Sequence, residues 1–344
     1  MTENLIKLKP SELYEILAES NESPYRIRQI HKWIWGKSSN NINSFSDLPK
    51  GFREFMAKKY HIERAEISSV VHSVDGAIKF LIKFENLDQV EAVFIPEEGR
   101  NTVCVSSQVG CPLKCTFCAT GSLGYRRNLG FFEILEQVRI VRDYVKTRIT
   151  NVVFMGMGEP LLNYSEVVEA ARILNDSSTF GVGSRKITIS TSGIIPGIRK
   201  LENEPEQFKL AVSLNSAVQG KREKLMPVAK KFPLEELKKV LMEYYEKKRR
   251  WITFEYILIP KVNDSHEDLE ALIDYTNAIP SKLNLIPYNP HPYATFRAPT
   301  DQEIEYFLKK LRRYIKRAVT LRKSKGQDIQ GACGQLAYFV KSKE

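Results

Sequence analysis

The sequence predicts an α/β fold in which a parallel sheet curves into a full or partial barrel and follows a smaller accessory region. Three observations support this prediction. Strand-like and helix-like segments alternate from residue 99 onward, which is typical of βα units. Polar or glycine-rich residues follow most of the strand candidates. Three closely spaced cysteines follow the first strand, at the end where a barrel carries its functional loops.

The first part of the chain, residues 1–60, is expected to be a helical accessory region. Ser11 is suited to cap a helix that presents Leu13, Ile16 and Leu17 on one face. A second helix is expected from about residue 25. The basic residues on the rest of that second helix fit either a solvated face or an RNA contact, and the sequence does not decide between the two.

After the helical region the pattern changes to short strands. Asp75-Gly76 predicts a hairpin turn between strands at 68–74 and 77–84. A third strand is expected at 89–96, with apolar residues on one face and Glu91 on the other. A lone glutamate on such a strand is usually a surface residue. Together these strands predict a β extension over residues 61–98.

The barrel is expected at 99–320, before a C-terminal segment at 321–344. Its strand candidates are Thr102–Ser106, Ile149–Met155, Lys186–Thr191, Phe208–Leu214, Ile252–Ile259 and Lys282–Ile286. The helices expected between and after them are Phe131–Lys146, Tyr164–Asn175, Pro196–Glu202, Pro233–Lys248, His266–Ala278 and Asp301–Arg317. Because parallel strands end on one face of a barrel, the polar residues that follow them predict a site on that face.

Cys111, Cys115 and Cys118 form a C-x3-C-x2-C motif that brings three thiolates around one small object. A structural zinc site takes four ligands in a closed tetrahedron, and no fourth Cys or His lies at short spacing. A cubane iron–sulfur cluster held by three cysteines instead leaves one iron free to bind another molecule. We therefore expect a [4Fe-4S] cluster, with a zinc knuckle that lacks one ligand, or buried cysteines without a role, as the alternatives.

The charge balance favours a polyanionic partner. The chain carries 52 Lys and Arg residues against 41 Asp and Glu residues, a net charge of +11, although a basic surface also serves solubility. Basic residues gather in Lys247–Arg250 and in Lys309–Lys325, and Arg126-Arg127 follows the cysteine motif. No signal-peptide pattern or membrane-spanning apolar run is present, so we expect a cytoplasmic protein with no membrane partner.

Four motifs, in the same order along the chain, resemble those of the RlmN/Cfr family of radical S-adenosylmethionine (SAM) RNA methyltransferases. They are CVSSQVGC at Cys104–Cys111, FMGMGEP at Phe154–Pro160, NLIPYN at Asn284–Asn289 and GACGQL at Gly331–Leu336. The resemblance covers most of the chain. It implies a radical SAM partial (β/α)6 barrel with an N-terminal helical domain and a small β extension, holding a [4Fe-4S] cluster and SAM.

The resemblance also implies which residues hold the cofactors. Cys111, Cys115 and Cys118 bind the cluster, and SAM chelates the remaining iron. The SAM contacts implied are Gly158, Glu159, Ser190, Ser213, Leu214, Asn215 and Asn289. Asn215 departs from the family, which usually has His at that position, and an amide does not titrate near neutral pH. Phe117 fits either packing against the SAM adenine or shielding of the cluster.

The two cysteines outside the motif receive roles by resemblance. Cys333 is methylated by one SAM, and a second SAM yields the 5′-deoxyadenosyl radical that activates this methyl group for addition to adenine. Cys104 then releases the product by forming a transient disulfide with Cys333. Glu91 matches the residue that accepts the proton from the ring. Polar SAM chemistry alone would not methylate adenine C2, because that carbon is not a nucleophile.

The substrates follow from the branch of the family. The RlmN branch methylates adenosine C2 in 23S rRNA and, in many bacteria, in tRNA, whereas the Cfr branch methylates C8 of the ribosomal base. Pro160 and Pro287 match RlmN-like sequences, so we favour C2. We also expect a reducing protein such as flavodoxin or ferredoxin as partner, and a monomer. The alternatives are Cfr-type C8 methylation, a radical SAM enzyme acting on a peptide or small molecule, and a non-catalytic zinc-containing RNA-binding protein.

Overall fold

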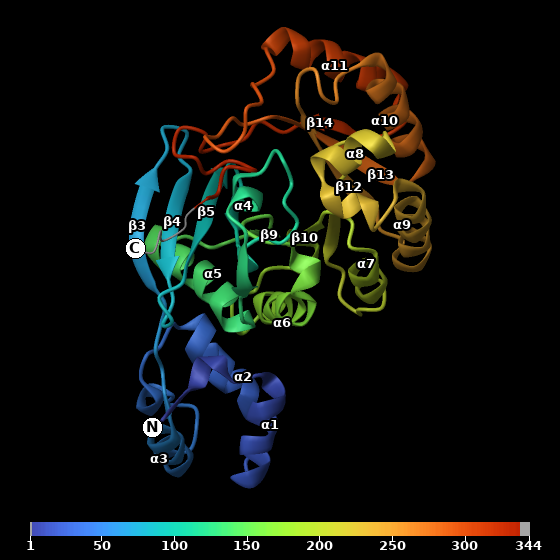
Figure 1. Cartoon of the computed structure of the whole chain (residues 1–344). Helices are drawn as coiled ribbons and strands as arrows, with labels where there is room; N and C mark the ends of the chain where they lie inside the picture. The colour runs from blue at the N-terminus through green and yellow to red at the C-terminus, as the bar shows by residue number, and fades with distance from the viewer. Residues whose placement is uncertain (1, 338–344) are drawn as a thin grey trace.

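The computed structural model describes residues 2–337. Residue 1 of the expected accessory region and residues 338–344 of the expected C-terminal segment lie outside this part of the chain. Ten of the described strands form one mixed sheet in the order β14-β13-β12-β11-β10-β9-β6-β5-β4-β3. Figure 1 shows this curved sheet with most of the larger helices on its outer side. Among residues 2–337, no helix is both long and apolar enough to cross a membrane.

Every pair of neighbours from β6 to β14 is parallel. These strands are β6 (Arg100–Cys104), β9 (Asn151–Phe154), β10 (Ile187–Thr191), β11 (Lys209–Ser213), β12 (Ile252–Leu258), β13 (Ser281–Pro287) and β14 (Val319–Leu321). Six of them overlap the predicted strands. The seventh, β14, was not predicted, because its three residues lie inside the basic stretch Lys309–Lys325 and are too few for their alternation to stand out.

Amphipathic helices follow the strands and bury their apolar faces against the sheet. They are α5 (Phe131–Val145), α6 (Tyr164–Asn175), α7 (Ile195–Leu201), α8 (Gln219–Leu225), α9 (Leu234–Lys248), α10 (His266–Ala278) and α11 (Asp301–Tyr314). The predicted bounds of α6 and α10 are confirmed residue for residue. Ser265 caps α10 by accepting a hydrogen bond from the Asp268 backbone N–H at 3.3 Å. Serine is a common N-cap residue, so the start of this helix could be recognised from the sequence. Helix α8 was not predicted.

The antiparallel extension of the sheet consists of β3 (Glu66–His72), β4 (Ile78–Lys83) and β5 (Gln89–Glu97). The predicted Asp75-Gly76 turn is confirmed, with Gly76 at φ +87°, and β3 and β4 pair antiparallel on either side of it. Glu91 on β5 is only 4% exposed, so the surface position usual for a lone strand glutamate does not hold here. Both faces of β5 are buried. The alternation of apolar and polar residues in the sequence indicates only one buried face, so it could not predict the other.

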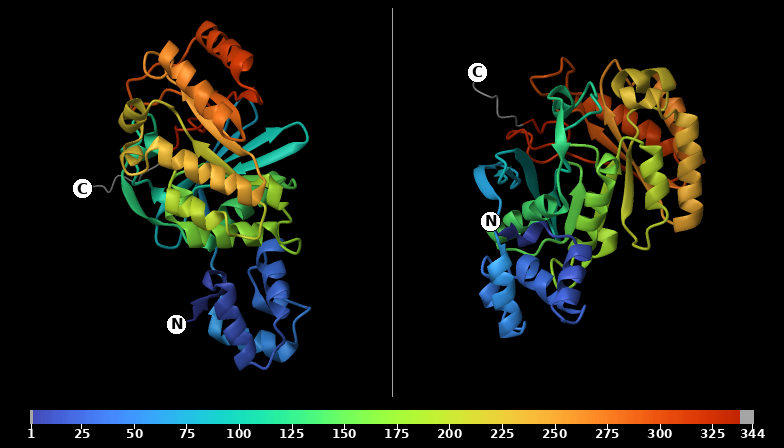
Figure 2. Two further views of the ribbon diagram at one scale, coloured as in Figure 1. Left: turned by 90° about the vertical axis from the view of Figure 1, so that its right-hand side faces the viewer. Right: turned by 60° about the horizontal axis from the view of Figure 1, so that its bottom comes forward.

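A small N-terminal unit of helices precedes the sheet and protrudes from it in both views of Figure 2. It contains α1 (Pro10–Glu19), α2 (Arg26–His31) and α3 (Lys50–Lys59), with β1 (Glu3–Asn4) parallel to β2 (Tyr60–His61). The predicted cap at Ser11 is wrong. Pro10 opens α1 because its fixed φ suits a first helical position, and the Lys9 backbone N–H donates to Glu12 Oε2 at 2.5 Å.

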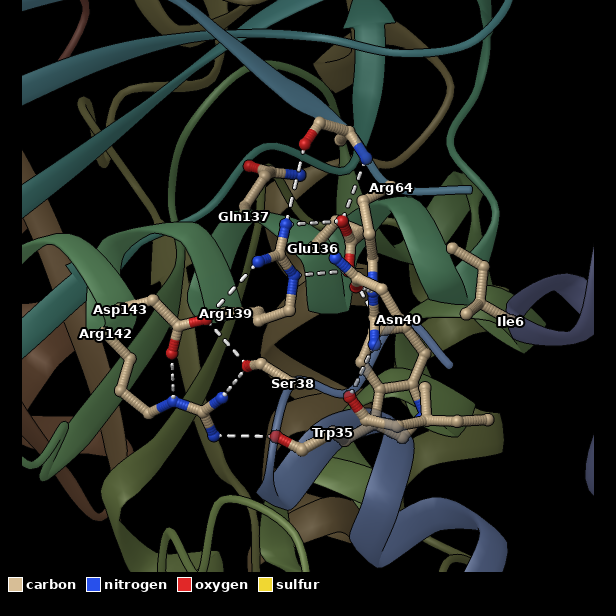
Figure 3. A network of polar contacts seen from close by, with 12 residues as sticks. Ile6, Trp35, Ser38, Asn40, Arg64, Glu136, Gln137, Arg139, Arg142 and Asp143 are labelled. Atoms are coloured by element: carbon tan, nitrogen blue, oxygen red, sulfur yellow. Dashed lines mark hydrogen bonds and ion pairs between the residues drawn. The ribbon is translucent and has the colours of Figure 1, made fainter. Parts of the chain in front are cut away.

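A buried ion network ties this unit to α5 (Figure 3). Glu136, on α5, is 1% exposed and accepts hydrogen bonds from Arg64 Nη1 at 2.9 Å and from Arg139 Nε at 2.7 Å. Arg64 also donates to the backbone carbonyl oxygens of Ile34 and Ser39, at 2.8 and 2.7 Å. Removing one partner of such a buried pair costs about 3–5 kcal/mol, so the network fixes where the N-terminal unit sits on the barrel.

Candidate active site

The interior of the barrel is a column built by every second residue of the parallel strands. Because side chains alternate in direction along a strand, one face of each strand looks inward. On β11 the inward residues include Lys209 and Ser213, and on β12 they are Thr253, Glu255 and Ile257. Ser213 and Ile257 line a first cavity at the carboxyl ends of the strands, and Lys209 and Thr253 line a second cavity at their amino ends.

The first cavity collects the three cysteines of the motif. Cys111, Cys115 and Cys118 line it together with residues from the ends of β9, β10 and β11. The cysteine loop lies between β7 (Gln108–Gly110) and the short helix α4 (Ala119–Ser122), and β7 pairs with β8 (Tyr125–Asn128). A side chain on Gly110, which has φ +75°, would place its Cβ within 2.1 Å of the Gly124 carbonyl oxygen. A glycine is therefore required where the loop closes.

Burial is the main reason that the pKa values of all three thiols are raised. For Cys111 the pKa rises to about 12, and the neighbouring Cys118 adds to the effect. For Cys115 and Cys118 burial again comes first, followed for Cys115 by the charges of the other two thiols. Three mutually repelling thiolates in a buried cavity need a cationic group among them, which fits an iron–sulfur cluster.

The donor set does not fit a site for a single metal ion. Within residues 2–337, no three Cys, His, Asp or Glu side chains converge closely enough to hold a single metal ion. The ligands of one zinc ion lie about 2.3 Å from it, whereas a cubane cluster binds each thiolate through a different iron. The cysteines line a common cavity without forming such a tight group. Cys111, Cys115 and Cys118 are therefore the residues that would hold the cluster.

Gly158 and Glu159 form the turn after β9 at the edge of this cavity. Gly158 has φ +101°, and a Cβ there would lie 2.6 Å from Gln108 Cβ, so packing alone demands glycine. The Glu159 carboxylate is 2% exposed and accepts hydrogen bonds from the backbone N–H groups of Ser192 at 2.7 Å and Leu161 at 3.1 Å. Glu159 thereby ties the carboxyl ends of β9 and β10 together.

The other predicted SAM contacts divide into two groups. Ser190, Ser213 and Asn215 line the first cavity, whereas Leu214 is fully buried with its backbone N–H donating to the Glu255 carbonyl oxygen at 2.9 Å. Asn215 Oδ1 already accepts a hydrogen bond from the Ile257 backbone N–H at 3.0 Å. Its φ of +56° is a conformation that Asn adopts more readily than most residues.

Asn289 lies after β13 and contacts the C-terminal segment. Its Nδ2 donates to Ser324 Oγ at 3.0 Å and to the Cys333 carbonyl oxygen at 3.2 Å. Its Oδ1 is buried and has no hydrogen-bond partner in the described part of the chain. An unpaired buried acceptor is costly, and Asn289 is not among the residues that line either cavity.

Cys333 lies between the two cavities. It lines the first cavity with the three motif cysteines, and it lines the second cavity with Cys104, the last residue of β6. Met155, Glu255 and Arg322 share this intermediate layer with it, since they also line both cavities. The structure thus brings Cys104 and Cys333 together, although they are far apart in sequence. Both are free thiols.

Hydrogen bonds from two directions fix the segment that carries Cys333. The Ala119 backbone N–H donates to the Gly334 carbonyl oxygen at 2.8 Å, which joins the segment to the cysteine loop. The Gly326 backbone N–H donates to Asp75 Oδ2 at 2.8 Å, which joins it to the β3–β4 turn. Figure 1 shows the orange-to-red segment reaching the tips of these strands. The β extension therefore has a purpose in the site, because it anchors the Cys333 segment.

Glu91 also helps to hold the segment that carries Cys333. Its Oε2 accepts a hydrogen bond from the Ala337 backbone N–H at 2.7 Å, and its Oε1 pairs with Lys79 Nζ at 2.9 Å. Glu91 is not among the residues that line either cavity. In this arrangement the carboxylate holds the chain four residues beyond Cys333.

Arg322 is the site residue that the sequence did not reveal, because it stood within a basic stretch interpreted as an RNA contact. Its Nη1 lies 3.5 Å from Met155 Sδ and 3.6 Å from Glu255 Oε2. Burial raises the pKa of the Cys104 thiol to about 12, the neighbouring Cys333 raises it further, and the Arg322 charge acts in the opposite direction. The Cys333 thiolate is in turn the largest cause of the raised pKa of Arg322. Arg322 is therefore the cation that favours the thiolate form of Cys104.

Comparisons with known proteins agree with this geometry. Residues 105–275 match the family model of the radical SAM superfamily, and residues 3–62 match that of the ribosomal RNA large subunit methyltransferase N-terminal domain. The chain is 41% identical to the dual-specificity RNA methyltransferase RlmN of Geotalea uraniireducens, over 94% of each chain. It is 38% identical to the probable dual-specificity RNA methyltransferase RlmN of Flavobacterium psychrophilum, over 96% of each chain.

Solved structures extend the likeness to the fold. The crystal structure of a radical SAM methyltransferase from Sphaerobacter thermophilus matches with a TM-score of 0.89 and 38% identity, covering 97% of this chain and 99% of that one. HydG, a maturase of the [FeFe]-hydrogenase, matches with a TM-score of 0.52 at 11% identity over 69% of this chain, which shows the shared barrel alone.

We expect Arg322→Met to make Cys104 less reactive toward iodoacetamide in cluster-free protein. The thiolate is the reacting form, and loss of the nearby cation raises the pKa of Cys104, so the rate at neutral pH should fall about tenfold. Peptide-resolved mass spectrometry across a pH series measures this rate for Cys104 alone. Arg322→Lys, which keeps the charge, and Lys323→Met, which removes an adjacent cation, serve as controls. An unchanged pH profile in Arg322→Met would contradict the assignment.

Proposed function

The chain belongs to the RlmN family of radical SAM RNA methyltransferases, and we propose that it transfers a one-carbon unit through Cys333 to C2 of an adenosine in 23S rRNA and in tRNA. The single observation that carries this proposal is the position of Cys333, which lines the cavity of the motif cysteines and the cavity of Cys104. A methyl carrier has to face the methyl donor on one side and the acceptor base on the other.

The first cavity supplies the groups that would hold the cofactors. Cys111, Cys115 and Cys118 would bind a [4Fe-4S] cluster, and Gly158, Ser190, Ser213 and Asn215 line the space beside them for SAM. Glu159 lines the same cavity and joins the ends of β9 and β10, and Leu214 and Asn289 flank it. When bound, the cluster and two SAM molecules per product supply one methyl group and one hydrogen-abstracting radical.

Cys333 and Cys104 carry out different covalent steps of the proposed reaction. The Cys333 thiolate takes the methyl group, and its sulfur then carries the carbon that becomes bonded to adenine C2. Glu91 accepts the proton that leaves C2, which requires its carboxylate to release Ala337 or to act through water. The base also has to lose the one unpaired electron left by the radical addition, and the bound cluster would accept it. The Cys104 thiolate attacks Cys333 sulfur, so that an S–S bond forms and the S–C bond breaks. The electron pair of that bond stays on carbon, which takes a proton and becomes the methyl group.

The remaining partners follow from this chemistry. The Cys104–Cys333 disulfide has to be reduced by a thiol reductant before the next turnover, and the cluster has to receive an electron from a flavodoxin or ferredoxin. We propose that the enzyme acts as a monomer in the cytoplasm, where both reductants are found. The N-terminal unit, within the expected region 1–60, would contribute to RNA binding.

The product identifies the reaction directly. Reconstituted enzyme with SAM, an electron donor and a 23S rRNA fragment should yield 2-methyladenosine, measured by mass spectrometry of the nucleosides against 2-methyl and 8-methyl standards. A tRNA substrate tested in parallel should give the same nucleoside. 8-Methyladenosine as the product would place the enzyme in the Cfr class, and no methylated adenosine with either RNA would refute the proposed function.

The two cysteine variants should fail in different ways. Cys333→Ala should lose RNA methylation by more than about a thousandfold, because no other residue can carry the methyl group, while its iron content of about four per chain stays unchanged. Cys104→Ala should instead accumulate a covalent protein–RNA species, seen on a denaturing gel as a nuclease-sensitive band. Normal turnover by Cys104→Ala without an adduct would remove Cys104 from the resolving role.

A further inference from the structure

A group of basic residues surrounds the amino ends of the parallel strands, on the side of the barrel opposite the motif cysteines. Each belongs to a different parallel strand between β6 and β13 or lies one or two residues before it. They are Arg100, Lys186, Lys209, Arg250 and Lys282. We name this group the basic rim. Burial is the largest cause of the lowered pKa of Lys209. The charges of the other four members lower this pKa further, so the five residues lie close enough to repel one another.

The basic rim is poorly neutralised by the protein itself. Among the described ion pairs, its only one joins Arg100 Nη2 to Glu97 Oε2 at 2.9 Å. Arg250 Nε donates to the neutral Gln207 Oε1 at 2.8 Å. Lys186, Lys209 and Lys282 are exposed. Like charges held together repel one another, and a polyanion that binds there removes the repulsion.

An exposed aromatic ring stands beside the rim. Trp251, the residue before β12, is 47% exposed. Lys282 Nζ lies 6.0 Å from the centre of its ring, and the Arg317 guanidinium carbon lies 5.8 Å from it. An exposed indole next to cations is the combination with which proteins stack unpaired bases while they hold the adjoining phosphates.

The rim opens into the second cavity, which leads to the two reactive thiols. Arg100 and Lys209 line that cavity together with Cys104 and Cys333, and its volume of about 840 Å³ is ample for a nucleoside. From Arg100 to Cys104 the chain runs through four residues of extended strand, about 13 Å. This depth is comparable with the length of one extruded nucleotide, from its phosphate to the far edge of its base.

The other basic surface of the barrel lacks this connection. Lys309 and Lys310 lie on α11, which packs on the outside of the sheet against α10 and β14. Neither of them lines the second cavity. RNA held by α11 would therefore have its phosphates on the outer layer of helices, without a path to Cys333.

We propose that the basic rim, and not the lysines of α11, binds the RNA phosphates that flank the target adenosine, so that the base enters the barrel through the amino ends of its strands. The methyl donor and the RNA then approach Cys333 from opposite ends of the same column. This inference rests on the proposed function in one respect, namely that the polyanion is the RNA substrate.

Matched double variants in the full-length, cluster-free protein test the rim. Lys209→Gln/Lys282→Gln should weaken binding of a fluorescein-labelled 23S rRNA hairpin by at least about tenfold at low salt. Loss of two phosphate contacts should also flatten the plot of log Kd against log salt by about 1.4–1.8. Lys309→Gln/Lys310→Gln, with the same change of charge on α11, should stay within about twofold of wild type. Thermal melting of each variant checks folding.

Each outcome decides a separate question. Rim variants that bind as wild type does, or that weaken no more than the α11 variants, would overturn the rim assignment while leaving the proposed function intact. If the wild-type protein neither binds nor methylates RNA, the proposed function itself is wrong. Trp251→Ala should weaken a hairpin with an unpaired adenosine more than a fully paired duplex of equal length, and equal losses on both would contradict base stacking at the rim.

Discussion

The alternation of side chains along seven parallel strands is the constraint on which the rest of the structure depends. It makes the barrel interior a column whose layers are set by strand position. Inward residues near the carboxyl ends face the motif cysteines, and those near the amino ends face the basic rim. Between them lies the layer of Met155, Glu255, Arg322 and Cys333. The two cavities are thus parts of one space that Cys333 divides.

A barrel with an open side cannot enclose such a column on its own. The segment after β14 closes it by reaching across to the β3–β4 turn, with Asp328 accepting hydrogen bonds from Ser73 Oγ at 2.6 Å and the Val74 backbone N–H at 3.1 Å. Glu91 and the cysteine loop hold the far end of the segment. Hydrogen bonds therefore join the β extension and the cysteine loop through the segment that carries Cys333.

The sequence was informative where one physical signal dominated. The alternation of strand-like and helix-like segments predicted the strands and helices of the barrel, an Asp-Gly pair predicted the hairpin, and cysteine spacing predicted a cluster site. It was uninformative where burial by distant parts of the chain determines the local structure. Strand β14 lies in a run of charged residues, and Glu91 is buried from both sides. Arg322 could not be separated from neighbouring lysines, because only its place in the column distinguishes it from a surface cation.

The division of the column by Cys333 is most directly tested by photo-crosslinking. An RNA hairpin with 8-azidoadenosine at the target position is irradiated with the full-length protein, and the crosslinked peptides are identified by mass spectrometry. We predict attachment to residues that line only the second cavity, such as Asn151, Thr253 or Asn284. Attachment instead to the cysteine loop or to Ser190–Ser192 would place the base in the first cavity and contradict a carrier that separates donor from acceptor.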